Sequence, residues 1–402
     1  MRKETKLLMA FWSPIYHEGG KSGRLNGYLD EFEKHKNIRI FYFGHPEKKD
    51  ILKNKHSILT SYCGSRFILA LSSLIQKLAS PLGYSSFARH MGTKILSYRI
   101  IYSKQFKQSN CVFTQSNFLP LVKAAKKRGL PVILEADADH PLSLWNRVRE
   151  RERINHISRR DADPINYWPA VSQAIKALEI ADNIIVFSTH AENTFIENGI
   201  NKEKLYKLRP PLSKRMFGSG TISKHPKFLF VSNHAVRKGL DIILEAWKIY
   251  KENGGRGTLC LLGKQSPAFK SIYNRYQSLH SVELKGRVNL NEMLTEEIGV
   301  LLLPSFSEGR PRVVLEAMDA GYPVVVSSAA MSDIVRNEYN GFLIPPDSKK
   351  LSKKLGEIDE MWENKILEIG RNASRAIDYE LEYNTYYEDV YNIISNCGDE
   401  LH

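Results

Sequence analysis

Apolar runs of strand length alternate with amphipathic segments of helix length along almost the whole chain. This alternation is typical of parallel sheets whose faces are covered by helices. The runs predicted as strands are residues 7–12, 39–44, 111–114, 132–136, 183–187, 228–232, 258–263, 282–285, 299–304, 324–328 and 342–344. The sequence therefore predicts an α/β protein of the doubly wound, Rossmann-like type.

A segment unsuited to helix or strand separates the runs before residue 210 from those after residue 225, since it contains Pro210, Pro211 and a Gly/Ser stretch. A chain of 402 residues is also long for one core. Single domains usually have roughly 100–200 residues. We therefore expect an N-terminal domain over 1–210, a linker over 211–225, a C-terminal domain over 226–378 and a C-terminal helix over 379–402 that packs back across the N-terminal domain. Ligands of such sheets bind outside the carboxyl ends of the strands, which predicts a substrate cleft between the domains.

The excess of positive over negative charge is confined to the first half of the chain. Residues 1–210 contain 34 Lys and Arg against 19 Asp and Glu, a balance of +15, whereas residues 211–402 contain 24 against 25, a balance of −1. Between Asp50 and Glu135 there are 13 Lys and Arg and no carboxylate. Such a run creates a positive field over part of the surface. It predicts an anionic partner, either a phospholipid surface, a lipid-diphosphate acceptor or nucleic acid, unless it is only a soluble basic face.

Composition narrows the class of protein further. A hydrophobic content of 42% and a charged content of 25% are ordinary for a globular protein. The four cysteines are far apart and indicate neither a disulfide framework nor a zinc site, so a cytoplasmic location fits best. No stretch approaches the roughly 20 apolar residues of a membrane span, and the N-terminus lacks the features of a secretory signal. Residues 61–81 are apolar with a basic flank, so they either lie on the cytoplasmic face of an inner membrane or form a core helix of the first domain.

The most specific local pattern begins at the apolar run 299–304. This run leads into a short loop, and Pro311 then opens an amphipathic helix, a place in the first turn that suits proline. Such a helix leaves the backbone N–H groups of residues 310–313 free to bind a phosphate or diphosphate. Glu308 lies just before the helix and Glu316 in its second turn, so both can face one crevice. Glu316 is placed to hold a ribose diol, and Glu308 to reach a transferred sugar or its departing phosphate.

The string over residues 305–325, Ser-x-x-Glu-Gly-x-Pro-x-x-x-Leu-Glu-Ala-Met-x-x-Gly-x-Pro-Val-Val, resembles the E-x7-E signature of the family 4 glycosyltransferases, which are retaining enzymes of the GT-B fold. The resemblance continues through Asp333 and an Asn-Gly turn at Asn340. It implies two Rossmann-like domains with a cleft between them. Asp333 stands where a glutamate is more usual, and Ala329 and Ala330 stand where the family often has a glycine pair.

The segment that follows the run 228–232 resembles the part of the family that grips the donor diphosphate with an arginine and a Lys-Gly pair. Lys238 and Gly239 match this pair. Asn233 stands at the arginine position, and an asparagine can hydrogen-bond an oxyanion but cannot neutralise it. Arg237 is a candidate to supply the missing charge.

Further donor contacts are implied by the same resemblance. Glycine turns at Gly263 and beside Arg287 correspond to those that line the donor cleft, and an N-terminal glycine loop corresponds to one that faces the donor phosphates. The predicted donor-binding residues are Glu316, Gly19, Gly20, Asn233, Arg237, Gly263, Arg287, Gly309, Arg310, Pro311 and Arg312.

One strand of the first half ends where the family usually has a histidine near the reacting sugar. Asp137 takes that place and His140 follows it; either can contact the substrate, or the acidic cluster caps the helix that begins at Leu142. The predicted catalytic residues are Glu308, Lys238, Asp137 and His140. Two Asp-x-Asp strings, at 137–139 and 161–163, are weak metal signals. Because a lysine and a helix N-terminus already serve the donor phosphates, we expect no required metal.

The resemblance implies transfer of a sugar from a nucleoside diphosphate sugar, UDP- or GDP-linked, to an acceptor hydroxyl, with the anomeric configuration retained. The basic first half suggests an acceptor that is lipid-linked or phosphorylated, as in the assembly of lipopolysaccharide, capsule or exopolysaccharide, near an anionic membrane surface. The alternative is a non-catalytic nucleotide-sugar-binding or partner subunit, which Asn233 and Asp137 keep open. Nucleic-acid binding is disfavoured because the lysines are not interleaved with stacking aromatics. An epimerase of the same fold would need no basic acceptor domain.

Overall fold

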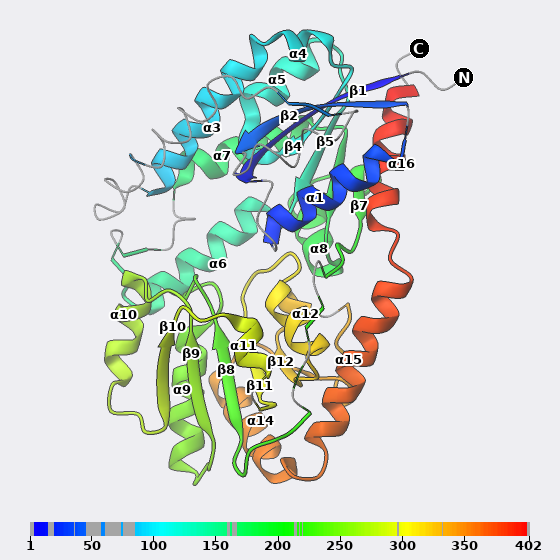
Figure 1. Cartoon of the computed structure of the whole chain (residues 1–402). Helices are drawn as coiled ribbons and strands as arrows, with labels where there is room; N and C mark the ends of the chain where they lie inside the picture. Colours follow the sequence, from blue (N-terminus) through cyan, green and yellow to red (C-terminus); the bar gives the residue numbers. More distant parts are fainter. Residues whose placement is uncertain are drawn as a thin grey trace.

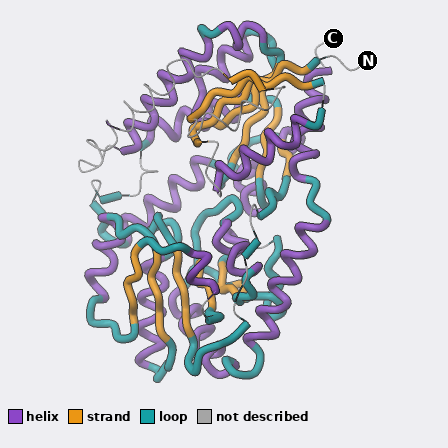
Figure 2. Tube along the Cα trace, viewed as in Figure 1, coloured by secondary structure: helices purple, strands orange, loops and turns teal. Residues whose placement is uncertain are grey.

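The computed structural model describes residues 4–14, 20–35, 37–45, 58–60, 74, 85–158, 161–162, 167–212, 215–216, 218, 220–295, 297–331 and 333–399. Within these residues the chain forms two parallel sheets, one in each half of the sequence (Figure 1). Figure 2 shows the two groups of strands well separated, each accompanied by helices. The predicted architecture of two doubly wound α/β domains is confirmed.

The first sheet has the strand order β3-β2-β1-β4-β5-β6-β7 in the described part of the chain. Its strands are β1 (Thr5–Pro14), β2 (Ile38–His45), β3 (Ile58–Thr60), β4 (Cys111–Gln115), β5 (Val132–Ala136), β6 (Asn183–Val186) and β7 (Leu205–Lys207). β4 is buried along its whole length, as expected for a parallel strand covered on both faces. β3 and β7 were not predicted, because runs of 3 residues are too short to show a periodicity.

Helices cover both faces of this first sheet. The helices of this half of the chain are α1 (Gly20–Glu33), α3 (Ser85–Ile101), α4 (Lys104–Gln108), α5 (Leu119–Lys127), α6 (Pro141–Ile154), which lies apart from the two cores below, α7 (Trp168–Ile180) and α8 (Thr189–Glu197). One hydrophobic core contains residues of α3, α4, α5, α7 and α8. The other contains residues of α1 and of the last helix, α16 (Tyr386–Asp399). The end of the chain therefore completes the first domain.

The second sheet has the order β10-β9-β8-β11-β12-β13 among the described residues. Its strands are β8 (Lys227–Val231), β9 (Thr258–Leu262), β10 (Val282–Gly286), β11 (Val300–Leu303), β12 (Val324–Val326) and β13 (Phe342–Leu343). The helices are α9 (Leu240–Glu252), α10 (Pro267–Tyr273), α11 (Leu290–Thr295), α12 (Arg312–Asp319), α13 (Ser328–Met331), α14 (Ser348–Met361) and α15 (Ile366–Glu382). In both sheets the carboxyl ends of the central strands lead into the loops that carry the site described below.

The chain returns to the first domain through the junction of α15 and α16. Residue 379, where the sequence predicts the last helix to begin, lies inside α15, and the break falls at residues 383–385. α15 runs along the second domain, and α16 continues upward beside α1 (Figure 1). The predicted boundaries at residues 210 and 225 stay a prediction.

Helix α6 connects the two halves in space. It belongs to the first half of the sequence and lies between the two domains (Figure 1). Its Val148 side chain is part of the hydrophobic core of the second domain, with Leu144 packed against that core. Polar residues on the same helix therefore reach the second domain.

Some predicted features fall on residues that the structure does not describe. These are Gly19, Asp163 and the segment 61–81 except for Leu74. Among the helices of the described residues, none has the length and apolar character needed to cross a bilayer.

Candidate functional site

The loop between β11 and α12 carries the carboxylate at the centre of the site. It runs from residue 304 to residue 311, and Pro311 is the N-cap of α12 rather than its first helical residue. The proline has no side chain that can cap the helix by a hydrogen bond. The Val314 N–H donates to the Pro311 carbonyl oxygen at 3.1 Å, so the N–H groups of Arg312 and Val313 are those left for a ligand at this end of α12.

Glu308, on this loop, is buried and holds two cations. Its Oε2 lies 3.0 Å from Nη1 of Arg237, and its Oε1 lies 3.3 Å from Nζ of Lys238. Ser305 Oγ also donates a hydrogen bond to Glu308 Oε1 at 3.1 Å. Burial would raise the pKa of the Glu308 carboxyl, but the charges of Arg237 and Lys238 and these hydrogen bonds outweigh it and lower that pKa. Burial lowers the pKa of Lys238, and the attraction of Glu308 opposes that shift.

The two cations come from the loop between β8 and α9. Gly239, the N-cap of α9, has φ +79°, a left-handed conformation that favours glycine. A Cβ atom at this position would lie 2.6 Å from the carbonyl oxygen of Pro304. Glycine therefore lets the β8–α9 loop approach the β11–α12 loop closely enough for Lys238 to reach Glu308.

A groove of about 550 Å³ lies along these two loops, and we call it the donor groove. The predicted site residues that line it are Asn233, Arg237, Lys238, Gly263, Arg287, Glu308, Arg310, Pro311 and Arg312. Residues far apart in the sequence thus meet in one cavity, and their role in donor binding stays a prediction. Asn233 lies at the groove and accepts a hydrogen bond from the backbone N–H of Lys264 at 3.1 Å. Arg237 places a guanidinium in the same groove, so a second cation is present beside Lys238.

Glu316 lies next to the donor groove. Arg312 Nη2 donates a hydrogen bond to Glu316 Oε1 at 2.7 Å, one helical turn away. Burial raises the pKa of Glu316, opposed by the charges of Arg312 and Lys238. A ribose that used this carboxylate would have to share it with Arg312.

The guanidinium of Arg310 is already engaged elsewhere. It forms an ion pair with Glu380 of α15 and donates a hydrogen bond to the carbonyl oxygen of Pro210 at 3.2 Å. Its side chain is 2% exposed, so these contacts satisfy a buried charge. Arg310 lines the donor groove, but its guanidinium contacts Pro210, near which the chain passes from the first domain to the second, and Glu380, near which the chain returns.

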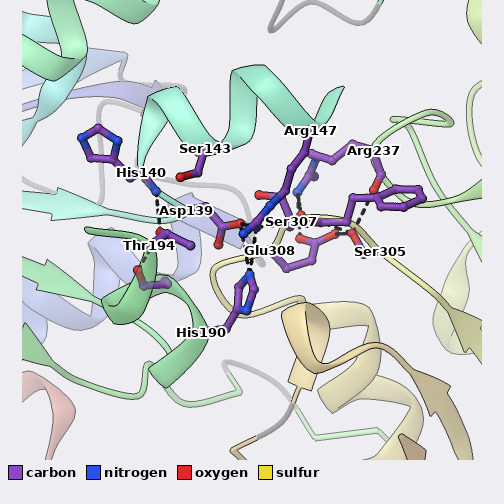
Figure 3. Close-up of polar contacts among 12 residues, drawn as sticks. Asp139, His140, Ser143, Arg147, His190, Thr194, Arg237, Ser305, Ser307 and Glu308 are labelled. Carbon is purple, nitrogen blue, oxygen red and sulfur yellow. Dashed lines mark hydrogen bonds and ion pairs between the residues drawn. The ribbon is translucent and has the colours of Figure 1, made fainter. Parts of the chain in front are cut away.

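Asp137 and His140 lie in different surroundings. A Cβ atom on Gly309 would be 2.3 Å from the carbonyl oxygen of Asp137, so the backbones of the two domains touch there. Asp137 lines a second pocket of about 290 Å³ in the first domain, together with Arg89 and the buried Glu135. His140 is the N-cap of α6, accepts a hydrogen bond from the Leu142 N–H, and points away from Glu308 in Figure 3. In the structure His140 itself, rather than an aspartate of the acidic cluster, is the residue that caps this helix.

The aspartate at the other end of the Asp-x-Asp string holds an arginine. Asp139 Oδ2 lies 2.6 Å from Arg147 Nη1 and 3.4 Å from His190 Nε2, and its side chain has no exposed area. Arg147 Nη1 also donates to the carbonyl oxygen of Phe306 at 3.2 Å, two residues before Glu308 (Figure 3). Arg147 therefore links α6 to the loop that carries Glu308.

Sequence patterns gave no signal for Arg147, His190 or His234. Arg147 and His190 lie on two separate helices, and a buried cluster of this kind has no sequence period. His234 lines both the donor groove and the pocket of the first domain, so the two cavities adjoin at this residue. The resemblance at the neighbouring Asn233 identifies this segment as part of the site. It does not indicate which way His234 faces.

Two further predictions concern glycines and a metal. Gly20 is the first residue of α1, which begins at the end of the undescribed residues 15–19. In the described part of the chain, no cluster of three or more His, Cys, Asp or Glu is arranged to hold a metal ion. That a metal is not required stays a prediction.

Two Rossmann-like domains with a cleft between them define the GT-B fold. HepE of Anabaena, solved with UDP and glucose, superposes with a TM-score of 0.61 at 16% identity and covers 98% of this chain and 100% of its own. TarM superposes with a TM-score of 0.65 at 12% identity, with 98% of each chain covered. The predicted GT-B fold is confirmed.

Residues 225–359, which contain the donor groove, match the family model described as Glycosyl transferases group 1. An uncharacterized glycosyltransferase of Haemophilus influenzae is 25% identical over 171 residues, 42% of this chain and 48% of the relative. The amylovoran biosynthesis glycosyltransferase AmsK of Erwinia amylovora is 25% identical over 184 residues, 43% of this chain and 45% of the relative. The chain thus matches less than half the length of these curated relatives.

Proposed function

We propose that the chain is a retaining glycosyltransferase of the family 4 type, which moves a sugar from a nucleoside diphosphate sugar to an acceptor hydroxyl. The observation that carries this proposal is the cluster of Lys238, Arg237 and Glu308 in the donor groove beside the uncapped end of α12. The part of the chain that contains this cluster matches a glycosyltransferase family model. A protein of the same fold, HepE of Anabaena, has been solved in complex with UDP.

The donor diphosphate would lie against Lys238, Arg237 and the first-turn N–H groups of α12. The difficult step is the breaking of the bond between the anomeric carbon and the diphosphate oxygen. Fixed cations and N–H dipoles stabilise the charge that develops on the leaving oxygen. The acceptor oxygen then bonds to the anomeric carbon on the same face, and its proton passes to the leaving phosphate, so no protein base is required.

The pocket that contains Asp137 would hold the acceptor. It adjoins the donor groove at His234 and lies in the domain that carries the excess positive charge. The acceptor would be lipid-linked or a surface-polysaccharide precursor, met at the cytoplasmic face of a membrane. The role of AmsK in amylovoran biosynthesis and the fold likeness to the lipopolysaccharide galactosyltransferase WaaB support this class of acceptor. Nucleic acid is not part of the proposal.

The alternative of a non-catalytic binding subunit rests on Asn233 and Asp137. An asparagine at that position removes one cation from the donor site, but Arg237 supports catalysis by placing a guanidinium 3.0 Å from Glu308 in the same groove. Donor binding without turnover, in the presence of a competent acceptor, would favour the alternative.

The test begins with a panel of UDP- and GDP-linked sugars added to the purified protein. A donor that binds the folded state raises its melting temperature. The donor that does so is then incubated with a lipid extract, and the anomeric configuration of the product is determined by NMR. Transfer with retention supports the proposal; stabilisation by no nucleotide sugar, or transfer with inversion, would overturn it.

A further inference from the structure

A second large cavity lies away from the donor groove, where the two domains are joined. It has a volume of about 710 Å³, within the range of roughly 300–1,000 Å³ typical of ligand pockets. Its walls are the end of β7, the loop that follows α13, and the junction of α15 with α16. We call it the hinge groove and define it by Arg209, Arg336, Tyr339, Arg375, Tyr379 and Tyr383.

Three tyrosines of the hinge groove are strongly exposed. Tyr379 is 67% exposed, Tyr383 63% and Tyr339 51%. The rings of Tyr379 and Tyr383 lie 4.8 Å apart, on the last turn of α15 and directly after it. Grouped aromatic rings on a surface indicate an interaction site, because their apolar faces gain from being covered while their hydroxyls stay hydrated. The C–H bonds of a sugar ring fit such a face, since they meet the negative face of the π system.

The unpaired charge of the hinge groove is positive. Arg209, Arg336 and Arg375 are exposed and form no ion pair with any residue of the described chain. The groove also contains three carboxylates: Glu380 pairs with Arg310, whereas Asp333 accepts from the Thr189 N–H and Asp389 from Thr385 Oγ1, which are neutral donors. The three arginines therefore face two carboxylates that keep their charge, and the balance in the groove stays positive by one. Guanidinium groups bind carboxylate and phosphate oxygens in a planar, bidentate manner. An occupant should therefore bring anionic groups as well as ring faces.

We propose that the hinge groove binds an anionic oligosaccharide, one whose sugars carry carboxylate or phosphate groups. Exposed tyrosines would stack on its rings, and the three arginines would hold its anionic substituents. The choice of a saccharide over other anions rests on the proposed function, whereas the charge and the aromatic faces come from the groove itself.

The hinge groove is separate from the donor groove, but one ion pair lies between them. Arg310 lines the donor groove and Glu380 lines the hinge groove. The hinge groove also contains residues of both domains, namely Arg209 after β7 and Arg336 in the second domain. An oligosaccharide bound here would remain on the enzyme while the donor groove empties and refills.

The test is a titration of the full chain with hexagalacturonate, with maltohexaose as the neutral saccharide of equal length, and with phosphatidylglycerol vesicles. We expect hexagalacturonate to bind and maltohexaose to bind much more weakly. The double variants R336Q/R375Q and Y379A/Y383A should each weaken hexagalacturonate binding by about tenfold or more, the first through lost charge-assisted contacts and the second through lost ring faces. Arg371→Gln, an exposed arginine one turn earlier on α15 and outside the groove, is the matched control.

Several results would overturn the proposal. They are no binding of hexagalacturonate, equal binding of maltohexaose, equal loss in Arg371→Gln, or binding of vesicles alone through the same residues. Glu308→Gln separates the two sites, because it should leave hexagalacturonate binding unchanged. If donor binding fails while hexagalacturonate still binds through the groove, the proposed function fails but the anion site stands.

Discussion

Glu308 forms ion pairs with two cations of the donor groove at once. The pair formed by Arg237 and Lys238 carries a charge of +2 against one carboxylate, so the cluster keeps a net positive charge that a diphosphate can use. The cations are also held in place before a donor arrives. Preorganised charge of this kind stabilises a leaving group without the cost of reorienting it during the reaction.

Replacing Glu308 by glutamine should separate binding from turnover. The variant removes the negative charge that competes with a diphosphate, so UDP or GDP should bind as tightly as to the wild type or more tightly. Turnover should fall by about 100-fold or more, because the charge near the reacting sugar is lost. Calorimetric titration and a transfer assay give the two values, with Glu360→Gln, on the exposed surface of α14, as control. Unchanged turnover would contradict the role given to Glu308.

His140 provides a prediction about stability and pH. The side chain is 2% exposed, and burial lowers its pKa to about 4. In the unfolded chain the pKa is about 6.5, so the unfolded state binds the proton more readily. The stability that comes from neutral, buried His140 is therefore complete above pH 6.5 and is lost as the pH falls toward 4, by on the order of 3 kcal/mol.

His140→Asn should remove this pH-dependent part, since asparagine can cap a helix but does not titrate. Urea unfolding at pH 7 and at pH 4.5 measures the difference for each protein, and the exposed His225→Asn is the control. A wild type and an H140N variant that lose the same free energy of unfolding between these pH values would contradict the account.

At the scale of elements, α6 couples the first domain to the loop that carries Glu308. Arg147 donates to the Phe306 carbonyl oxygen, and the guanidinium of Arg151, one turn later, lies 4.8 Å from the centre of the Phe306 ring. Arg151 also pairs with Asp241 in the first turn of α9. Two arginines on one face of α6 thus hold both loops of the donor groove.

Arg147→Ala should lower turnover by about 10- to 100-fold while changing the Kd for the donor nucleotide much less. A loop displaced by about 1 Å can cost that much in rate. Arg147→Lys should restore part of the turnover, because lysine keeps one donor for Asp139 or Phe306. Arg149→Ala, on the same helix with Glu152 and Trp145 as neighbours, is the control. Equal losses in turnover and donor affinity would show that Arg147 acts by binding rather than by positioning.

A substitution at Gly309 tests the close contact between its backbone and that of Asp137 in the other domain. A methyl group at this position would overlap the carbonyl of Asp137, so Gly309→Ala should lower both turnover and stability, the latter by about 1–3 kcal/mol. Gly356→Ala in α14 is the matched control. It has open space around the new methyl group and should be neutral or stabilise the helix by about 0.5–1 kcal/mol. Equal stability of the two variants, by thermal unfolding, would contradict a close contact at Gly309.

The loops of the second domain could be predicted from the sequence because each follows a long apolar strand and ends at a glycine or proline. The pattern from Glu308 to Glu316 is local, so spacing alone places both residues beside one helix start. The contacts of Arg310 and Arg147 could not be predicted in this way. Arg310 meets Glu380 only after α15 has packed along the second domain, and Arg147 meets Phe306 only after the two domains have packed together; neither pair has a fixed sequence separation.

At the scale of the whole molecule, the two domains are linked by the chain crossing near Pro210 and by the junction of α15 and α16. Arg310 contacts both crossings, through the Pro210 carbonyl and through Glu380. The sequence predicts two domains and their order, since the strand runs fall on either side of a Pro-Pro segment. It misplaces the start of the last helix, because the apolar spacing continues across the break at residues 383–385.

The central claim is that Lys238 in the second domain holds the diphosphate of a sugar nucleotide. The most direct measurement is calorimetric titration of UDP and GDP into the wild type, Lys238→Met and Lys354→Met at one salt concentration. Lys354 is a matched control, since its side chain is 14% exposed against 13% for Lys238 and it pairs with Glu357 away from the donor groove. We predict that one nucleotide binds the wild type and Lys354→Met equally and binds Lys238→Met about tenfold or more weakly, as the loss of a charge-assisted contact requires. Equal affinity for all three proteins, or no affinity for either nucleotide, would contradict the claim.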